Sequence, residues 1–150
     1  MPVEKNTLLK DVLFFVKDDL DGAITDPIAA SRPTNSKFIM TSYPSRPVNY
    51  PLITIKTLNI NAKRSGMQTT AQDITIDLEI RIWARNTKER DEIFDQVFSR
   101  LGDIQFTSST GSIANNLHDL LVGSAVEITE EGDKGIKSKV IGIQYKFFNI

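Results

Sequence analysis

The clearest pattern along the chain is an unbroken alternation of apolar and polar residues over Asp73–Arg85. The apolar positions are Ile74, Ile76, Leu78, Ile80, Ile82 and Ala84. The positions between them are Thr75, Asp77, Glu79, Arg81 and Trp83. Successive side chains of a β-strand point to opposite faces, whereas a helix with this spacing would have no apolar stripe. The pattern therefore predicts a strand with one buried face and one mostly polar face.

The residues after this strand predict a helix. Asn86 is a favourable N-cap, and Glu89 three positions later completes a capping-box pattern. An apolar stripe at helical spacing is then formed by Ile93, Phe94, Val97, Phe98 and Leu101. The residues expected to point outward are Lys88, Arg90, Asp91, Asp95 and Arg100. With Gly102 at the usual C-terminal position, we expect this stripe to pack on the apolar face of the strand.

A second helix is predicted near the N-terminus, from Leu8 to Leu20. Its apolar positions at helical spacing are Leu9, Val12, Leu13, Val16 and Leu20. Asn6 or Thr7 is a suitable N-cap, and Gly22 lies just past the expected end. The apolar face of this helix is expected to dock on a sheet.

Between the two helices the pattern predicts strands and loops. Ser36–Ser42 can form a short strand, while the three prolines within Tyr43–Pro51 favour an extended surface segment. Leu52–Ala62 is rich in β-branched residues and is predicted to be a strand. The apolar residues of this segment change from one face to the other partway along it, and a β-bulge near Lys56–Thr57 would explain this change. A polar loop is expected over Lys63–Gln72.

The C-terminal third completes the predicted fold. Ile113–Val122 is interpreted as a short helix. Gly123–Glu131 and Ile136–Ile150 flank a Gly-Asp-Lys-Gly turn and predict a β-hairpin. Because strands are grouped with helices instead of alternating strictly with them, an α+β fold is expected. It consists of a mainly antiparallel sheet of four to five strands, two main helices packed on one face, and the C-terminal hairpin.

Composition narrows the function classes. At 150 residues the chain has the usual size of one domain, so we expect a single domain over residues 1–150. It has no cysteine, which excludes disulfides, thiolate metal sites and cysteine nucleophiles. A net charge of −1 supplies no overall positive charge for binding nucleic acid. Without a signal-peptide pattern or an apolar run near the roughly 18 residues of a membrane span, a soluble setting is expected.

The sequence contains no recognisable catalytic constellation. His118 is the only histidine, and its polar neighbours favour a surface or lightly packed side chain. The small polar run Ser108–Ser112 lacks the ending of a P-loop. Asp77 and Glu79 share one strand face about 7 Å apart, but their alternation with Arg81 is typical of an exposed strand. We therefore expect no enzymatic activity, no cofactor and no metal site.

Residue types that favour interfaces gather in two places. Trp83 lies on an otherwise polar strand face, where it either contacts a partner or packs beneath a segment of its own chain. The proline-rich segment adds tyrosine and arginine, which are enriched at interfaces. The candidate subunit interface comprises Tyr43, Arg46, Tyr50, Asp77, Glu79, Arg81 and Trp83. Lys63 and Arg64 form a candidate channel or partner loop.

These features together resemble a known family. Tyr-Pro pairs at Tyr43 and Tyr50 lead into the strand that begins at Leu52. After a polar loop, a long alternating strand ends in Ile-Arg-Ile-Trp-Ala at residues 80–84, and a capped helix starts at Asn86. This arrangement resembles the small tail-completion (tail terminator, or neck) proteins of long-tailed viruses of bacteria and archaea. The resemblance covers about residues 8–101, and the C-terminal hairpin more loosely.

The resemblance implies a structural role. Proteins of this family form six-fold rings at the head-proximal end of the tail tube, stop its polymerisation and join it to the head connector. DNA passes through their channel without specific binding, and the family brings no catalytic residues. For this chain the resemblance implies a homo-hexamer in the virion, assembled in the host cytoplasm. Its partners would be the tail-tube protein and the head connector or adaptor protein, with no membrane.

Two alternatives to a tail terminator stay open. One is a head-closure or adaptor protein, which occupies the layer nearer the capsid. The other belongs to a different class, a small α+β domain that binds nucleic acid. A basic patch formed by Lys56, Lys63, Arg64 and Arg81 would serve that second alternative.

Overall fold

The computed structural model describes residues 7–33, 37–41, 49–64, 66–67, 71–104, 117–128 and 137–149. In this part of the chain helix α1 spans Leu8–Ala23 and helix α2 spans Thr87–Asp103. The strands are β1 (Ile39–Met40), β2 (Leu52–Arg64), β3 (Gln72–Ala84), β4 (His118–Ile128) and β5 (Lys137–Asn149). Both helices and the three long inner strands, β2, β3 and β5, therefore form close to where the apolar pattern predicts them.

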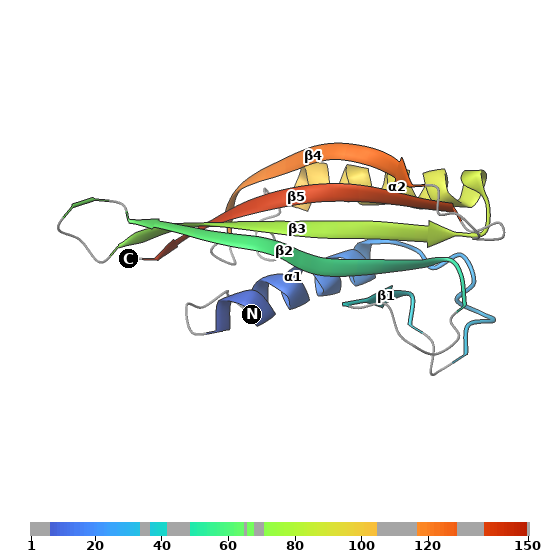
Figure 1. Cartoon of the computed structure of the whole chain (residues 1–150). Coiled ribbons are helices and arrows are strands. Elements are labelled where there is room, and N and C mark those ends of the chain that lie inside the picture. Colours follow the sequence, from blue (N-terminus) through green and yellow to red (C-terminus); the bar gives the residue numbers. More distant parts are fainter. Residues whose placement is uncertain are drawn as a thin grey trace.

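The five strands form one sheet in the order β1-β2-β3-β5-β4 (Figure 1). β1 pairs with β2 in parallel, and the other pairs are antiparallel. The consecutive strands β4 and β5 form the C-terminal pair expected from the sequence. A bulge in β2 lies between Thr57 and Asn59, within about one residue of its predicted place. The mainly antiparallel α+β fold is thus confirmed.

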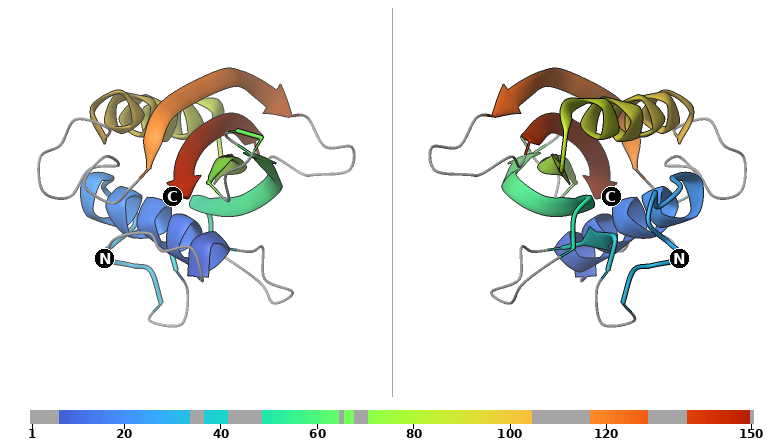
Figure 2. Two further views of the ribbon diagram at one scale, coloured as in Figure 1. Left: turned by 90° about the vertical axis from the view of Figure 1, so that its left-hand side faces the viewer. Right: turned by 90° about the vertical axis from the view of Figure 1, so that its right-hand side faces the viewer.

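The core lies between the sheet and the two helices. The six apolar side chains of β3 are all buried, as its alternation predicts. The five larger ones, all but Ala84, belong to one apolar cluster with Val12, Val16 and Leu20 of α1 and with Ile93 and Val97 of α2. Both helices therefore cover the same face, and in the two views of Figure 2 they lie on the same side of the curved sheet. Neither of these helices is long and apolar enough to cross a membrane.

The far ends of β2 and β3 extend beyond both helices (Figure 1). From Leu58 onward every described side chain of β2 is exposed. Two of these exposed side chains, Leu58 and Ile60, are large and apolar, and Met67 beyond the strand is almost fully exposed. This part of the sheet is held by strand pairing and has little helix cover.

The start of α2 is capped as its sequence predicts. The Asn86 side chain accepts a hydrogen bond from the backbone N–H of Glu89 at 2.9 Å. The Glu89 carboxylate turns back and accepts from the backbone N–H of Arg85 at 3.2 Å, one residue before the expected partner. The Arg85 side chain forms an ion pair with the same carboxylate and holds the pKa of Glu89 below its ordinary value. These contacts hold the first turn of α2 against the end of β3.

Replacing Asn86 with alanine is expected to lower the free energy of unfolding by about 0.5–2 kcal/mol, because the N–H of Glu89 loses its partner. Asn86→Asp keeps an acceptor at this place and serves as the matched control. Urea unfolding of the three proteins measures the difference. Equal midpoints for the alanine and aspartate variants would contradict this role of Asn86.

Three expectations about helix faces are wrong. Leu9 and Phe98 are exposed, because Leu8 takes the core position in α1 and Phe98 stacks on Phe94 at the outer side of α2. Arg90, expected to point outward, is buried. Its guanidinium donates to the Glu127 carboxylate of β4 at 2.8 Å and to that of Asp91 at 3.1 Å. These two carboxylates compensate the buried charge.

The short helix expected over Ile113–Val122 is also wrong, since His118–Ile128 forms β4. Residues 113–116 lie outside the described residues. Gly102 does not end α2, which continues to Asp103 before Ile104 occupies the C-cap. Gly22 likewise lies inside α1. Among the described residues, a Cβ atom at either glycine would meet nothing within 4 Å, so close packing does not require glycine at these positions.

Candidate interaction surface

The face of the sheet opposite the helices, called here the helix-free face, is the candidate functional surface. β3 contributes Thr75, Asp77, Glu79, Arg81 and Trp83, all of them half-buried. β2 and β5 place Thr54, Lys56, Val140, Gly142 and Gln144 beside them. The structure therefore brings four of the predicted interface residues together: Asp77, Glu79, Arg81 and Trp83.

Trp83 closes one end of the helix-free face through contacts within its own chain. Its indole Nε1–H donates to Thr54 Oγ1 at 3.1 Å. The Arg81 guanidinium lies 4.0 Å from the centre of the indole ring, and its Nη2 donates to Ser138 Oγ at 3.4 Å. Leu52, opposite Trp83 in the strand register, is fully buried. Of the two alternatives for Trp83, these contacts favour packing within its own chain, which leaves its role in an interface a proposal.

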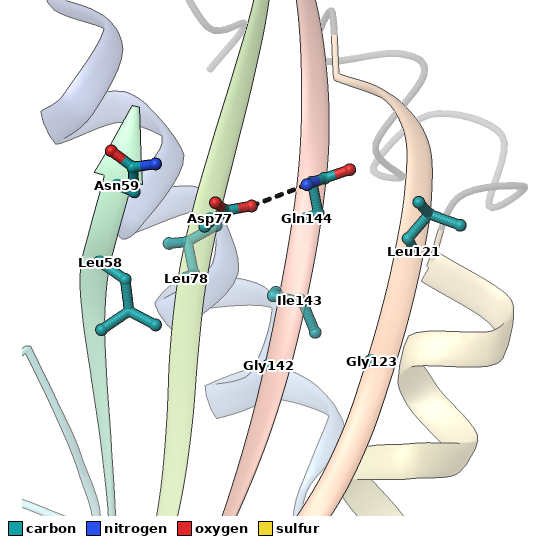
Figure 3. A pocket seen from close by; sticks show the side chains of 9 residues that line it. All are labelled: Leu58, Asn59, Asp77, Leu78, Leu121, Gly123, Gly142, Ile143 and Gln144. Carbon is teal, nitrogen blue, oxygen red and sulfur yellow. Dashed lines mark hydrogen bonds between the residues drawn. The ribbon is translucent and has the colours of Figure 1, made fainter. Parts of the chain in front are cut away.

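An open trough of about 580 Å³ lies in the middle of the helix-free face (Figure 3). Its rims are Leu58 on β2 and Leu121 on β4, which are 54% and 60% exposed. Between these rims, Gln144 Nε2 donates to Asp77 Oδ1 at 2.9 Å. Both leucines are apolar side chains left without cover by the described part of the chain. The trough therefore combines apolar rims with a polar centre.

Two glycines on neighbouring strands form part of the trough floor. A Cβ atom at Gly123 would lie 3.1 Å from the carbonyl oxygen of Gly142. At Gly142 a Cβ atom would meet nothing within 4 Å, because the open trough lies above it. The trough has room at this place because the two strands carry no side chain at these two positions.

Arg32 connects Asp26, which precedes the predicted arm Tyr43–Pro51, to the last residues of that arm. Its guanidinium forms an ion pair with Asp26 and donates to the backbone oxygens of Asn49 and Pro51. It also lies 5.4 Å from the centre of the Phe38 ring. Asp26 and the end of the arm are thus bound to the same buried guanidinium group, next to the start of β2.

The other candidate residues are placed as follows. Tyr43 and Arg46 lie outside the described residues, and Tyr50 is half-buried beside the buried Pro51. Lys63 and Arg64 were expected in a loop, which is wrong, since both belong to the far end of β2, where they are exposed. Lys63 pairs with Asp73 in the register, whereas Arg81 pairs with Thr54. Eight residues along a strand are about 27 Å, so Arg81 cannot belong to a basic patch with Lys63 and Arg64.

The trough was not predicted from the sequence. Leu58 falls where the alternation of β2 slips, and that slip was correctly interpreted as a bulge. A bulge turns a side chain out of the normal alternation, which was the available signal for Leu58. Leu121 was assigned to a helix, so its place on a sheet edge could not follow. Gly123 and Gly142 meet only through the register of β4 and β5.

The described residues include no group of three or more histidine, aspartate or glutamate side chains placed to hold a metal ion. His118 is half-buried at the start of β4. The groups that the described part of this surface presents are apolar rims, a hydrogen-bonded carboxylate and a stacked arginine. No protein-family model matches this chain, and no curated protein matches it.

Proposed function

We propose that the chain is a structural protein of the virion neck that assembles into a ring at the head-proximal end of the tail. In this role it ends polymerisation of the tail tube and joins the tail to the head connector. The proposal starts from the resemblance to tail-completion proteins. The α+β fold expected from the residue pattern is the one observed, and it has the single helix layer and the exposed sheet face that a ring subunit would use.

The single observation that carries the proposal is the one-sided, asymmetric sheet. Helices cover one face, while the helix-free face holds an open trough. The two edges of the sheet also differ, since β1 and β2 form one edge and β4 forms the other. A ring made of identical subunits needs two different lateral surfaces that fit each other. The extended ends of β2 and β3 supply a further surface for a neighbour along the tail axis.

The test is assembly in the presence of the tail-tube protein encoded by the same virus. Native mass spectrometry and light scattering are expected to show hexamers of this chain, and capped tubes of fixed length should form on mixing. An unrelated tail-tube protein serves as the control and should remain uncapped. A chain that stays monomeric at every concentration, also with its own tail-tube protein, would overturn the proposal.

A pull-down distinguishes the neck layers. A tail terminator is expected to retain both the tail-tube protein and the connector, whereas a head-closure protein would retain the connector alone. For the nucleic-acid alternative, the doubly substituted variant Lys63→Glu, Arg64→Glu is the probe. Salt-dependent DNA binding by the unsubstituted chain that this variant loses would favour that alternative.

A further inference from the structure

The outer edge of β2 is open at its far end. β1 pairs with β2 only at Ile53 and Thr54, so among the described residues no strand lies beside Ile60–Arg64. An unpaired strand edge presents backbone N–H and C=O groups to which another extended chain can bind. We propose that Ile60–Arg64 binds an extended, acidic segment of another protein as an added strand. This binding does not depend on the proposed ring.

A hydrogen bond at the start of β2 shows which backbone groups point outward. The Ile53 N–H donates to the carbonyl oxygen of Phe38 at 2.7 Å, so it points away from β3. In an antiparallel pair, residues whose backbone groups point to the partner strand alternate with residues whose groups point away from it. Ile53 lies opposite Ile82 of β3. Every second residue of β3, counted from Ile82, therefore lies opposite a β2 residue whose backbone groups point outward.

Beyond the bulge, this alternation gives outward-pointing residues at regular spacing. These β2 residues are Ile60, Ala62 and Arg64, which lie opposite Ile76, Ile74 and Gln72. Their N–H and C=O groups lie on the open edge with the spacing that strand pairing requires. The bulge between Thr57 and Asn59 interrupts this spacing, so the regular part of the edge begins after it. The edge lies where β2 extends beyond both helices (Figure 1).

The charged side chains nearest this edge are basic. Lys63 and Arg64 are exposed at successive positions, so their side chains lie on opposite faces of the sheet. Asp73 lies opposite Lys63 on β3, but these two described residues form no ion pair, and one carboxylate oxygen of Asp73 is buried. A strand added beside β2 would lie about 5 Å from β2 and about 10 Å from β3, a distance at which salt screens exposed charges. The added strand is therefore closest to the two cations.

These features define the segment that fits the edge. Two successive acidic residues would place one carboxylate beside Arg64 on one face and the other beside Lys63 on the opposite face. Ile60, which is 42% exposed, lies four positions from Arg64 on the same face, where an apolar residue of the added strand would cover it. The fitting segment thus has two acidic residues, two further residues and an apolar residue, in either chain direction. A second copy of β2 has no acidic residue and lacks this pattern.

Two synthetic peptides test the proposal. The first is Thr-Glu-Glu-Thr-Thr-Val-Thr and the second has the reversed sequence, so both strand directions are covered. Each is blocked at its ends, labelled with a fluorophore and titrated with the full chain. We expect the fluorescence anisotropy of at least one peptide to rise, with an affinity that weakens as salt is added. Peptides with lysine in place of both glutamates are the controls and should not bind. Absence of binding by both acidic peptides at low salt would overturn the proposal.

Ala62→Pro tests whether the backbone of the edge is the binding group. Proline has no N–H, and at this position the N–H points away from β3, so the pairing between β2 and β3 is kept. We expect the peptide to bind about ten-fold more weakly or worse, with an unchanged circular dichroism spectrum and urea midpoint. Ala62→Ser keeps the donor and is the matched control, with an affinity close to that of the natural chain. A folded proline variant that binds as tightly as the natural chain would overturn the proposal.

A charge variant keeps the proposal testable if the proline variant does not fold. Lys63→Gln combined with Arg64→Gln is expected to weaken binding of the acidic peptide by about three-fold or more at low salt and to leave the urea midpoint unchanged. Unchanged affinity would overturn the match to an acidic segment.

Self-association of the natural chain is the remaining outcome. Light scattering is expected to show no dimer that Ala62→Pro abolishes, and such a dimer would assign the edge to a second copy instead of another protein. None of the peptide measurements requires ring assembly. Failure of the proposed ring therefore leaves this proposal intact, and failure of peptide binding leaves the proposed ring intact.

Discussion

Replacing Leu78 with alanine is expected to lower the free energy of unfolding by about 2–5 kcal/mol. Leu78 is fully buried at the middle of β3, on the face that both helices cover. Truncation removes apolar contacts and leaves a cavity in a closely packed core. Urea unfolding followed by circular dichroism measures the loss, and Trp83, the only tryptophan, reports on the sheet by fluorescence.

The matched control is Leu58→Ala, at the bulge of β2 beside Leu78. Leu58 is exposed on the helix-free face, so the same truncation there is expected to change the free energy of unfolding by less than about 0.5 kcal/mol. Equal losses for the two variants would contradict the assignment of the two faces.

Replacing Arg32 with alanine is expected to cost about 3 kcal/mol of stability, since removal of one partner leaves a buried charge uncompensated. The Arg32 and Asp26 side chains are only 5% and 15% exposed. The variant would also deprive the carbonyls of Asn49 and Pro51 of a donor. Lys88→Ala is the control, because the Lys88–Glu92 pair is exposed and its loss is expected to change stability by less than about 0.5 kcal/mol. Similar losses for both variants would show that the Arg32 contacts contribute little.

The same cluster predicts a dependence of stability on pH. Burial pushes the pKa of Asp26 upward, but hydrogen bonds from Arg32 and from the Ile28 N–H, together with the Arg32 charge, outweigh it. The pKa therefore lies below its ordinary 3.8. The stabilising contribution of the carboxylate is complete above the unfolded value and is lost as pH falls through the lowered folded value. The difference between the natural chain and Asp26→Asn should stay constant above about pH 5 and shrink below about pH 4. A difference that grows on acidification would contradict this sign.

The parts of the fold that were predictable have local causes. The alternation of β3 and the cap of α2 each depend on residues that are close together in the sequence, so both patterns can be recognised directly in it. β4 was misassigned because its irregularities break the alternation. Leu117 and Leu120 lie on the core side while Leu121 lies on the other, which mimics helical spacing over a short window. A bulged strand thus lacks the period by which strands are recognised.

The candidate surface was only partly predictable for the same reason. The polar face of β3 follows from alternation within one strand, so Asp77, Glu79 and Arg81 were placed together correctly. The trough depends on four strands in register, and that register includes bulges in β2 and β4. The contacts of Arg32 were not predictable from the sequence, because its partners at Asn49 and Pro51 are 17 and 19 residues away. Contacts of this range have no periodic signal in a single sequence.

β1 is only two residues long, but it limits where another strand can bind along the outer edge of β2. It occupies the outer side of β2 at Ile53 and Thr54, so a strand that arrives at this edge meets a fixed stop. Sliding by one residue would turn every side chain of the arriving strand to the opposite face, and the stop limits such sliding at one end. In the ring proposed above, the register of a strand bound at this edge would help to set the angle between neighbouring subunits. The shortest strand of the sheet would in this way help to determine how many subunits close the circle.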